Sequence, residues 1–467
     1  MSAASSVTAA GPRPEGEGRS RLQRLLDGLP RRAATPCLFV DGRWHDYAAL
    51  AAVVATWRAR LASTGPAPGS TLALQADYSL DSVGLLLAAW AQGLIVALVP
   101  RSADPTSYLD DADAVGRFEL SSGHGVRWQA HTPRRAPHPL VAALAADGEA
   151  GLVIFTSGST GRPRGAVHGV ERFLGKFDRP GRALRTLPFL QFDHVAGMDT
   201  LLYTLSAGGS LVVAARRDPP TICGLIETAG VEVLSTSPSF LRLLWASGAA
   251  GGRDLSSVKV VTYGSEPMDA ATLQRVAQLF PQARLSQKYG TTELGAPRTV
   301  SRGDDSLWIR IEGEGVRAEV RDGLLWIRSE SAFLGYLDEV GAPRQAGSWY
   351  CTGDLVEQDG PWIRVLGRGG ELINVGGEKV VPAEVEAAIL ELDDVAAVAV
   401  SGQTHPLLGQ VVTARVQLAP GADAASIETR VRRHCRARLP RHAVPVTVDL
   451  ATESLTNDRQ KVQRRRD

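Results

Sequence analysis

The stretch that governs the interpretation of this chain is Thr156-Ser157-Gly158-Ser159-Thr160-Gly161-Arg162-Pro163-Arg164-Gly165. It follows a short apolar run at residues 152–155 that predicts a buried strand. The glycines let the backbone pass close to a ligand, and the hydroxyl and guanidinium groups supply donors without any carboxylate. Because a donor-rich segment of this kind suits a polyphosphate, the stretch predicts a nucleotide-phosphate loop.

Two well-known phosphate loops do not fit this stretch. No Gly-Lys-Ser/Thr closes it at the spacing of a Walker A loop. Pro163 prevents it from running straight into a helix, as the dinucleotide-binding fingerprint requires. A flexible surface turn is the alternative interpretation. The preceding strand and the two arginines favour a phosphate clamp of a third kind.

The composition limits the class of protein. A chain of 467 residues is expected to form two or three units with a large core. The net charge of +1 gives no electrostatic reason to expect nucleic acid or a membrane surface as a partner. No apolar run reaches the roughly 20 residues that span a bilayer. The cysteines are far apart, which favours a cytoplasmic protein over a disulfide framework or a zinc site: Cys37, Cys223, Cys351 and Cys435.

The pattern along the chain predicts an α/β fold with two domains. Residues 1–20 lack the apolar core of a signal peptide and are expected to be a disordered leader. Over residues 21–368, helical stretches alternate with short Val- and Leu-rich strands, which predicts a large layered N-terminal domain with mostly parallel sheets. The irregular segment 118–138 is expected to be a spacer between subdomains.

A change in pattern marks the second domain. The adjacent glycines of Gly367-Arg368-Gly369-Gly370 predict a hinge near Gly370. Residues 369–467 then predict a small, mobile α+β domain with a strand-turn-strand unit and a helix opened by Pro382. A small domain joined to a large one by a glycine hinge is typical of enzymes that close over a ligand.

Three further stretches carry reactive side chains. They are Gln287-Lys288-Tyr289-Gly290-Thr291-Thr292-Glu293, Trp349-Tyr350-Cys351-Thr352-Gly353-Asp354, and Gly367-Arg368 with Gly376-Gly377-Glu378-Lys379. Thr292 and Glu293 offer a hydroxyl for a phosphate oxygen and a carboxylate for a hard cation, and Asp354 follows a glycine turn and could accept hydrogen bonds from ribose hydroxyls. Each stretch alone is also compatible with an ordinary turn or helix surface.

In this order, and with these separations, the four stretches resemble the serial motifs of the adenylate-forming superfamily of acyl-CoA synthetases, luciferases and peptide-synthetase adenylation domains. The resemblance covers residues 151–464, with a weaker similarity back to residue 35. It implies a nucleotide site for ATP, whose phosphates, adenine and ribose would be held by Thr156, Ser157, Gly158, Ser159, Thr160, Gly161, Arg164, Gly264, Ser265, Glu266, Tyr289, Gly290, Thr291, Asp354 and Arg368.

The resemblance also implies the residues that act on the reacting atoms. Thr292 would touch the α-phosphate, Glu293 would hold Mg²⁺, and Lys461 would bridge the acid's carboxylate and the α-phosphate. A carboxylate that attacks a phosphorus surrounded by negative oxygens needs such cations and preorganised donors. Lys461 in a basic tail is also compatible with a plain surface lysine.

The chain departs from the pattern of the superfamily at several positions. Arg164 stands where the phosphate loop usually has lysine, so the charge is kept but a planar fork replaces a point donor. Gln460 replaces the usual glycine before the lysine, and the usual upstream proline is missing. Gly370 replaces the Asp or Lys of the hinge, which should make the rotation of the small domain easier and less well defined.

The glycine pair and the acid pocket are the parts that bear on specificity. By resemblance, Gly376 and Gly377 would let the pantetheine arm of coenzyme A approach closely, as in acyl- and aryl-CoA ligases. The pocket for the acid would be lined by His194, Met198, Ser237, Gly264 and Lys288, with His194 as the gate toward ATP. His194 is equally a candidate for binding nearby backbone groups at a loop-to-helix junction. Lys288 either points into the pocket, which would favour an acid with a second anionic or polar group, or points outward.

We therefore expect an ATP-dependent, AMP-forming ligase that activates a carboxylic acid and transfers the acyl group to a thiol. Coenzyme A is the thiol we expect. Within this class, the alternatives are transfer to a carrier protein or an amine, or activation of another oxyanion. From other classes, the alternatives are a phosphotransferase that forms ADP and a catalytically silent nucleotide-binding protein.

Overall fold

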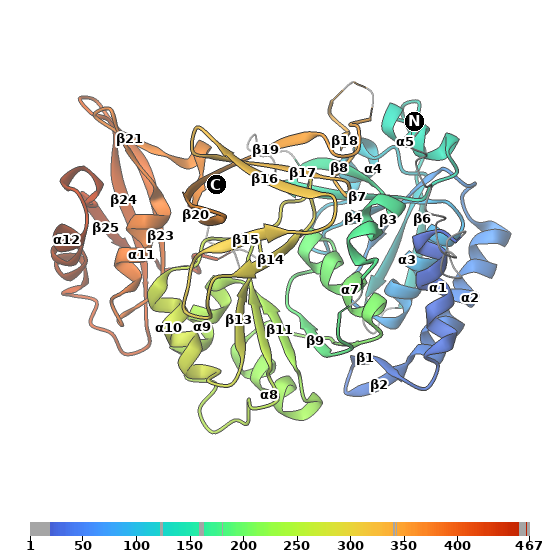
Figure 1. Cartoon of the computed structure of the whole chain (residues 1–467), viewed down its shortest axis with the longest axis horizontal. Coiled ribbons are helices and arrows are strands. Elements are labelled where there is room, and N and C mark those ends of the chain that lie inside the picture. Colours follow the sequence, from blue (N-terminus) through green and yellow to red (C-terminus); the bar gives the residue numbers. More distant parts are fainter. Residues whose placement is uncertain are drawn as a thin grey trace, which may run out of the picture.

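The computed structural model describes residues 19–121, 125–157, 163–179, 181–339, 341, 343–456 and 464. Figure 1 shows three sheets packed together over residues 19–368, with a smaller unit, coloured orange and red, at one side of them. The predicted fold class, an α/β protein with a large layered domain of mostly parallel sheets and a small α+β domain, is confirmed.

The first sheet carries the strand that precedes the candidate phosphate loop. Within the described residues it has seven strands in the order β18-β8-β7-β4-β3-β5-β6. The neighbours β7, β4, β3 and β5 are parallel, and the outer pairs are antiparallel. The bounds are β3 (Thr71–Gln75), β4 (Ile95–Val99), β5 (Gly116–Ser121), β6 (Gly125–Ala130), β7 (Gly151–Ser157), β8 (Pro163–Gly169) and β18 (Gly335–Tyr336). The apolar run 152–155 is buried inside β7, so the predicted strand is confirmed.

The segment 118–138 is not the spacer that the sequence suggested. β5 and β6 form an antiparallel hairpin at the edge of the first sheet, in which Phe118 pairs with Trp128 and their ring centroids are 4.6 Å apart. Most residues of β6 are exposed, because this strand is the last of the sheet. The polar and glycine-rich composition therefore belongs to an edge strand that faces solvent.

The second sheet is also mostly parallel. Its order is β13-β12-β11-β9-β10-β1-β2, and only the β1–β2 pair is antiparallel. The bounds are β1 (Pro36–Val40), β2 (Arg43–Asp46), β9 (Arg185–Pro188), β10 (Ser210–Val212), β11 (Val233–Thr236), β12 (Val260–Tyr263) and β13 (Arg284–Gln287). The strands predicted near residues 210, 231 and 258 are confirmed to within two residues at each end.

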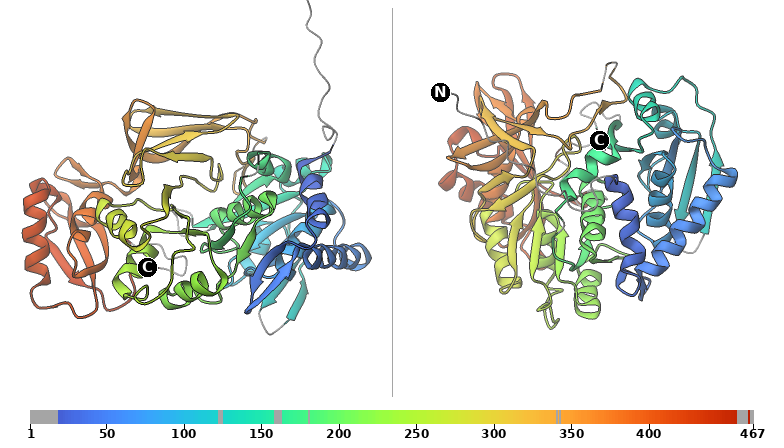
Figure 2. Two further views of the ribbon diagram at one scale, coloured as in Figure 1. Left: turned by 60° about the horizontal axis from the view of Figure 1, so that its bottom comes forward. Right: turned by 45° about the vertical axis from the view of Figure 1, so that its right-hand side comes forward.

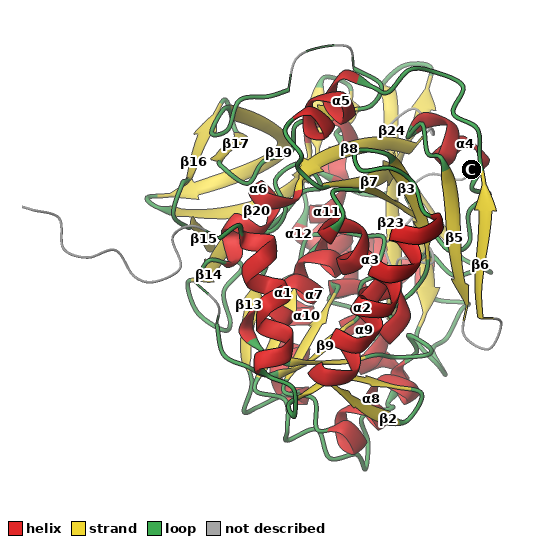
Figure 3. Cartoon of the chain, turned by 90° about the vertical axis from the view of Figure 1, so that its right-hand side faces the viewer, coloured by secondary structure: helices red, strands yellow, loops and turns green. Residues whose placement is uncertain are grey.

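The helices fill the space between these two sheets and cover their outer faces. The largest apolar cluster joins α1, α2, α3 and α7 between the sheets, and Figure 3 shows these helices side by side. A second cluster places α8, α9 and α10 on the outer face of the second sheet, and α4 and α5 cover the outer face of the first. The bounds are α1 (Arg21–Arg31), α2 (Tyr47–Thr64), α3 (Leu80–Ala91), α4 (Thr106–Asp111), α5 (Pro139–Ala146), α6 (Val170–Leu174), η1 (Gly175–Phe177), α7 (Val195–Ala207), α8 (Pro219–Ala229), α9 (Pro238–Ser247) and α10 (Ala270–Leu279).

Local chemistry explains where several of these helices begin. Asp46, Ser79, Asp218 and Asp269 each accept a hydrogen bond from the backbone N–H three residues further on, which satisfies a donor of the first turn. α3 is apolar around most of its circumference because it lies between two layers. None of the helices in the described part of the chain is long and apolar enough to cross a membrane.

The alternation of helices and strands, which the sequence extended to residue 368, ends at β13. Residues 298–368 form an antiparallel third sheet in the order β14-β15-β20-β19-β17-β16. Its strands are β14 (Arg298–Ser301), β15 (Ile309–Glu312), β16 (Val316–Arg321), β17 (Leu324–Ser329), β19 (Trp349–Asp359) and β20 (Trp362–Arg368). The pairing of β19 with β20 sets Asp354 opposite Arg368.

The C-terminal unit follows the predicted order of elements. It consists of η2 (Gly369–Glu371), β21 (Ile373–Val375), β22 (Glu378–Val380), α11 (Pro382–Leu390), β23 (Val395–His405), β24 (Gly409–Leu418), α12 (Ile427–Arg438), η3 (Arg441–Ala443) and β25 (Thr447–Leu450). Its own apolar core includes Val385 and Ile389. Figure 2 (left) shows this unit at one end of the molecule, where Arg275 of α10 bonds the carbonyl oxygen of Leu390 at 3.1 Å and pairs with Asp393. The predicted domain boundary and the hinge at Gly370 stay predictions.

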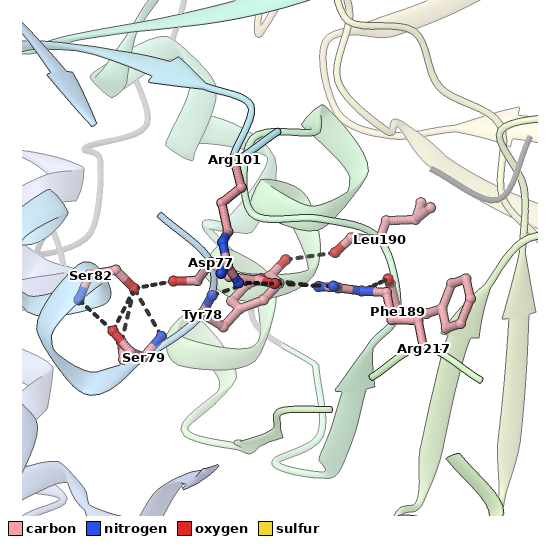
Figure 4. A network of polar contacts seen from close by, with 8 residues as sticks. All are labelled: Asp77, Tyr78, Ser79, Ser82, Arg101, Phe189, Leu190 and Arg217. Carbon is pink, nitrogen blue, oxygen red and sulfur yellow. Dashed lines mark hydrogen bonds and ion pairs between the residues drawn. The ribbon is translucent and has the colours of Figure 1, made fainter. Parts of the chain in front are cut away.

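A polar joint connects the two parallel sheets at the ends of their strands (Figure 4). Asp77 follows β3 of the first sheet, and both of its carboxylate oxygens accept hydrogen bonds from Arg217, which follows β10 of the second, at 3.0 and 3.1 Å. The Nε of Arg217 also donates to the carbonyl oxygen of Phe189 at 2.7 Å. The hydroxyl of Tyr78 donates to the carbonyl oxygen of Leu190 at 3.1 Å. The joint therefore fixes the segment that leads from β9 into α7.

We predict that this joint stabilises the packing of one sheet on the other. Arg217→Leu should lower the free energy of unfolding by about 2 to 3 kcal/mol, because it leaves the mostly buried Asp77 carboxylate with the exposed Arg101, 4.0 Å away, as its counter-charge. Asp77→Asn combined with Arg217→Leu should cost less than the sum of the single variants. Denaturant unfolding measures both. Arg216→Leu is the control, since this exposed neighbour pairs only with the nearby Asp218. Equal losses in the free energy of unfolding for Arg216→Leu and Arg217→Leu would contradict the prediction.

Candidate active site

The predicted site residues follow the carboxyl ends of strands in both parallel sheets. β7 ends at Ser157 and leads into the phosphate-loop candidate, β11 precedes Ser237, β12 precedes Gly264, and β13 precedes Lys288. Open parallel sheets bind ligands at this edge. Thr156 is half-buried in β7. Gly158, Ser159, Thr160 and Gly161 lie outside the described residues.

The acid expected at the ribose is held by two partners. Asp354 is 6% exposed. Its carboxylate accepts a hydrogen bond from the Tyr289 hydroxyl at 2.5 Å and forms an ion pair with Nε of Arg368 at 2.9 Å. Arg368 also donates to the carbonyl oxygen of Thr352 at 3.0 Å. Burial raises the pKa of Asp354, while the Arg368 charge and the Tyr289 hydrogen bond lower it. The structure thus brings together three residues that the sequence placed in one nucleotide site.

Tyr289 is more enclosed than its predicted stacking role suggested. Only 6% of its surface is exposed, and it packs in an apolar cluster under the third sheet. Burial and then the Asp354 charge raise the pKa of its hydroxyl, so the group stays protonated as a donor. Stacking of the Tyr289 ring on adenine stays a prediction.

The carboxylate expected to hold a metal is held by tyrosines. The hydroxyl of Tyr336 donates to Glu293, and the hydroxyl of Tyr350 lies beside the same carboxylate. Burial, followed by the Glu293 charge, raises the pKa of both hydroxyls. The ring of Tyr336 in turn lies 3.7 Å below the Arg164 guanidinium carbon. Tyrosine hydroxyls hold the Glu293 carboxylate in place without neutralising its charge.

Arg164 already has acidic partners. Its guanidinium group bonds Asp338 at 2.7 and 2.9 Å and Glu339 at 2.7 Å. These carboxylates raise the pKa of Arg164 and balance its charge. The sequence alone gave no indication of this balance, because Asp338 and Glu339 lie in the loop after β18. A contact between Arg164 and phosphate stays a prediction.

The segment expected beside adenine passes very close to its neighbour. A Cβ atom on Gly264 would lie 2.4 Å from the carbonyl oxygen of Lys288, so only glycine fits there. Ser265 has a φ of +73°, a conformation that non-glycine residues adopt mainly at functional sites and turns. Glu266 accepts a hydrogen bond from the backbone N–H of Ser239 at 2.6 Å and so caps α9. A Cβ on Gly290 would meet the carbonyl oxygen of Gly295 at 2.6 Å.

The predicted wall of the acid pocket divides into accessible and enclosed positions. His194 is half-buried and caps α7, where its Nδ1 accepts a hydrogen bond from the backbone N–H of Ala196 at 3.1 Å. This is the backbone contact that the sequence offered as the alternative to a gate. Met198 and Ser237 have no exposed surface, because Met198 belongs to the central apolar cluster and Ser237 caps α9. They can touch a substrate only if the covering residues move. Lys288 is exposed.

A buried ion pair supports the turn that carries Thr292 and Glu293. Lys176 of η1 and Asp199 of α7 form the pair, with side-chain exposures of 12% and 10%. The second Asp199 oxygen accepts a hydrogen bond from Ala296 N–H at 2.6 Å. Burial lowers the pKa of Lys176, and Asp199 raises it. The sequence gives no local signal for this pair, because the two residues are remote from the motifs.

The C-terminal candidates are only partly described. Lys461 lies outside the described residues. Arg464, three positions further on, forms a bidentate pair with Glu386 of α11 at 2.7 and 2.8 Å and also pairs with Glu371. Gly376 and Gly377 form the turn between β21 and β22 with φ values of +62° and +96°, so the hairpin itself requires glycine there. Their contact with coenzyme A stays a prediction.

The residues that would meet ATP and Mg²⁺ fit those groups in their chemistry. A buried acid beside an arginine suits ribose hydroxyls, and the close approaches at Gly264 and Gly290 leave backbone where a side chain would intrude. In the described ranges, no three or more His, Cys, Asp or Glu side chains gather as a metal cluster. Mg²⁺ is usually held by one or two carboxylates together with phosphate oxygens, which is the arrangement that Glu293 offers.

Comparison with known proteins finds relatives for both units. The family model described as AMP-binding enzyme matches residues 111–337, and the model described as AMP-binding enzyme C-terminal domain matches residues 384–460. The chain is 28% identical over 351 residues to Acyl-CoA synthetase 7 of Caenorhabditis elegans, covering 67% of this chain and 63% of that protein. It is 27% identical over 495 aligned positions to phenyloxazoline synthase MbtB of Mycobacterium tuberculosis, covering 95% of this chain and 34% of that protein. The chain thus spans less than two thirds of the length of either relative.

The fold has close counterparts among solved structures. The crystal structure of the anthranilate CoA ligase AuaEII in complex with anthranoyl-AMP matches with a TM-score of 0.79 and 20% identity, over 96% of each chain. At this identity the match concerns the fold.

We predict that Asp199 stabilises the native state through its charge. Asp199→Asn should lower the free energy of unfolding by about 3 kcal/mol, because the buried Lys176 ammonium group loses its counter-charge. Lys176→Met combined with Asp199→Asn should recover part of this loss, since the double variant buries no charge. Chemical denaturation of the three chains measures the effect. Lys259→Met, which breaks the exposed pair with Glu232, is the control and should cost less than about 1 kcal/mol. A double variant that is less stable than Asp199→Asn would contradict this account.

Proposed function

The chain belongs to the AMP-binding enzyme family of the adenylate-forming superfamily, and from this premise we propose that it activates a carboxylic acid with ATP and transfers the acyl group to a thiol. In the first step an oxygen of the acid attacks the α-phosphorus of ATP, the bond to the bridging oxygen of the β-phosphate breaks, and pyrophosphate leaves. In the second step a thiol attacks the acyl carbon, loses its proton, and AMP leaves. The observation that carries the proposal is the group formed by the buried Asp354 and Tyr289 with the more exposed Arg368, near Glu293.

Asp354 binds the ribose in this proposal. A carboxylate offers about four lone-pair positions, and the protein partners Tyr289 and Arg368 occupy two of them. Two ribose hydroxyls therefore find free acceptor positions on a carboxylate whose orientation is already fixed. The energetic cost of burying Asp354 is met in the free protein by Arg368 and Tyr289, so binding requires little reorganisation.

Glu293 binds Mg²⁺ in this proposal, and Thr292 contacts the α-phosphate. Bound Mg²⁺ would supply positive charge to the phosphate oxygens and ease attack by a carboxylate. Tyr336, whose ring lies against the Arg164 guanidinium group, donates to Glu293 and holds it in one orientation. The ion pair of Lys176 and Asp199 fixes the end of the same turn through Ala296.

Lys461 and His194 serve the reacting acid. Lys461 bridges the carboxylate and the α-phosphate during the first step, and rotation about Gly370 carries it away before the second. In this proposal His194 stands at the start of α7 between the acid pocket and the nucleotide, where its Nδ1 accepts a hydrogen bond from the backbone N–H of Ala196 that fixes the ring. Thr156 to Gly161 hold the β- and γ-phosphates until pyrophosphate leaves.

Coenzyme A is the acceptor we propose, because a relative aligned over 67% of this chain is named an acyl-CoA synthetase. Gly376 and Gly377 then admit the pantetheine arm. Their positive φ values favour glycine, so no side chain stands in its path at these two positions. A carrier-protein thiol, an amine, or an oxyanion other than a carboxylate would change the second step or the substrate but not the nucleotide site.

The first prediction from this proposal concerns the reaction itself. The chain should catalyse acid-dependent exchange of labelled pyrophosphate into ATP, and full turnover should yield AMP and pyrophosphate. Aliphatic, aromatic and dicarboxylic acids form the test panel, with and without coenzyme A, and mass analysis identifies the products. Asp354→Ala, which removes the ribose acceptor, is the inactive reference. Formation of ADP and phosphate would replace the proposal with phosphotransfer, and no exchange with any acid would reject it.

The second prediction separates the two steps. Lys461→Ala should lower adenylation by at least roughly 100-fold, because the attacking carboxylate loses the cation that offsets charge repulsion. Thioester formation from supplied acyl-AMP should change little. Arg466→Ala, another basic residue of the tail, is the matched control for a general loss of positive charge. Equal losses of both steps in Lys461→Ala would refute the division of labour.

A further inference from the structure

The strand register determines which way Lys288 points. β12 and β13 pair Thr262 with Ser286 and Tyr263 with Gln287. The backbone N–H of Lys288 donates to the carbonyl oxygen of Tyr263 at 2.7 Å, so the pairing continues one residue beyond β13. Because successive side chains in a strand alternate between faces, Lys288 lies on the same face of the second sheet as Ser286 and Thr262.

That face is turned toward α7. Ser235 pairs with Thr262, and its hydroxyl lies 3.5 Å from the hydroxyl of Thr200 on α7. The opposite face of the same strands, which carries Val261 and Leu285, packs against α8 to α10. Lys288 therefore projects into the space between the carboxyl ends of the second sheet and α7, the helix that begins after His194. The outward alternative left open by the sequence does not match this register.

The side chain of Lys288 reaches solvent among small neighbours. The neighbouring positions on this face carry only small side chains, at Ser235, Thr262, Gly264 and Ser286. Lys288 is exposed to solvent, yet surrounding protein atoms, followed by the charges of Arg284 and Arg298, lower the pKa of its ammonium group. This position, exposed to solvent but with protein atoms around it, is called the recess below.

The recess has a surplus of positive charge. Asp199 is the nearby acid, but its two oxygens already bind Lys176 and the N–H of Ala296. Among the residues that the structure describes, none accepts a hydrogen bond from the Lys288 ammonium group. Arg298 has only a distant carboxylate, Glu312 at 3.9 Å, and Arg284 lies on the same face as Lys288 by strand alternation. An ammonium group without a hydrogen-bonded partner, with further cations near it, favours an anionic ligand group.

We propose that the acid used by this protein carries a second acidic group and that Lys288 binds it. The inference rests on the proposed function, because it assigns the substrate class of the same site. One carboxylate is presented to ATP, and the other lies against the recess wall formed by Lys288 and the end of β12. An aliphatic or aromatic monocarboxylic acid would leave the Lys288 ammonium group without a partner, which lowers its affinity.

Pyrophosphate exchange with matched acids tests this inference. Succinate is compared with butyrate, glutarate with valerate, and phthalate and isophthalate with benzoate, so each pair differs in the second carboxylate. The wild type should show a higher kcat/KM for at least one dicarboxylate than for its monocarboxylate partner. Lys288→Met keeps the stem and removes the charge, and it should lower the dicarboxylate value by roughly 10- to 100-fold, the range of a charge-assisted hydrogen bond. The monocarboxylate values and the KM for ATP should stay within about threefold.

Two further measurements make the result decisive. Lys259→Met, an exposed lysine at the other end of β12, is the matched control and should leave the preference unchanged. Calorimetric titration of the same acids reports binding without turnover, so a failure of catalysis is distinguished from a failure of recognition. Absence of exchange together with charge-dependent dicarboxylate binding would reject the proposed reaction and support the Lys288 site. No preference for dicarboxylates in either assay, equal losses for both members of a pair, or a raised KM for ATP would overturn the inference.

Discussion

The structure depends on the polar joint between its two parallel sheets. Each sheet buries one face against the central helices, and apolar packing alone does not select one sliding position of the sheets over another. The bidentate contact of Asp77 with Arg217 is directional and selects one position, because both ends of the pair have fixed geometry. The Tyr78 hydroxyl adds a second bond to the segment after β9. Through that segment, the joint places the first turn of α7, and with it His194 and Asp199, opposite the ends of β11 to β13.

The site is organised by hydroxyl and guanidinium partners that hold two acids in fixed orientations. Tyr289 and Arg368 fix Asp354, and Tyr336 fixes Glu293. A hydroxyl donor stabilises a carboxylate and leaves its negative charge, whereas a lysine partner would cancel it. This difference explains why tyrosines surround the acid proposed for Mg²⁺. These tyrosines, Tyr336 of β18 and Tyr350 of β19, come from strands that are remote in the sequence from the turn after β13 that carries Glu293.

Two lysines near α7 show how partners decide what a charge does. Lys176 is buried, and Asp199 compensates it, so it serves the architecture of the turn. Lys288 meets solvent, and the nearby acid is already occupied, so its charge is available to a ligand. The sequence singles out Lys288 through the family resemblance and gives no signal for Lys176. Their different surroundings follow from the register of β13 and from the position of η1 against α7.

The sequence by itself determined the local features. The apolar run before Thr156, the strands of the second sheet, the helix at Pro382 and the glycine turn at Gly376 follow from patterns that span a few residues. The order of motifs along the chain was enough to identify the family. Only the tertiary structure decided that β5 and β6 form an edge hairpin, that Tyr336 reaches Glu293, that Asp199 pairs with Lys176, and that Lys288 shares a face of the second sheet with Thr262 and Ser286. These contacts join residues far apart in the chain, and their geometry is set by strand pairing and layer packing. A local pattern cannot encode such geometry, because the same side chain faces the opposite way after a register shift of one residue.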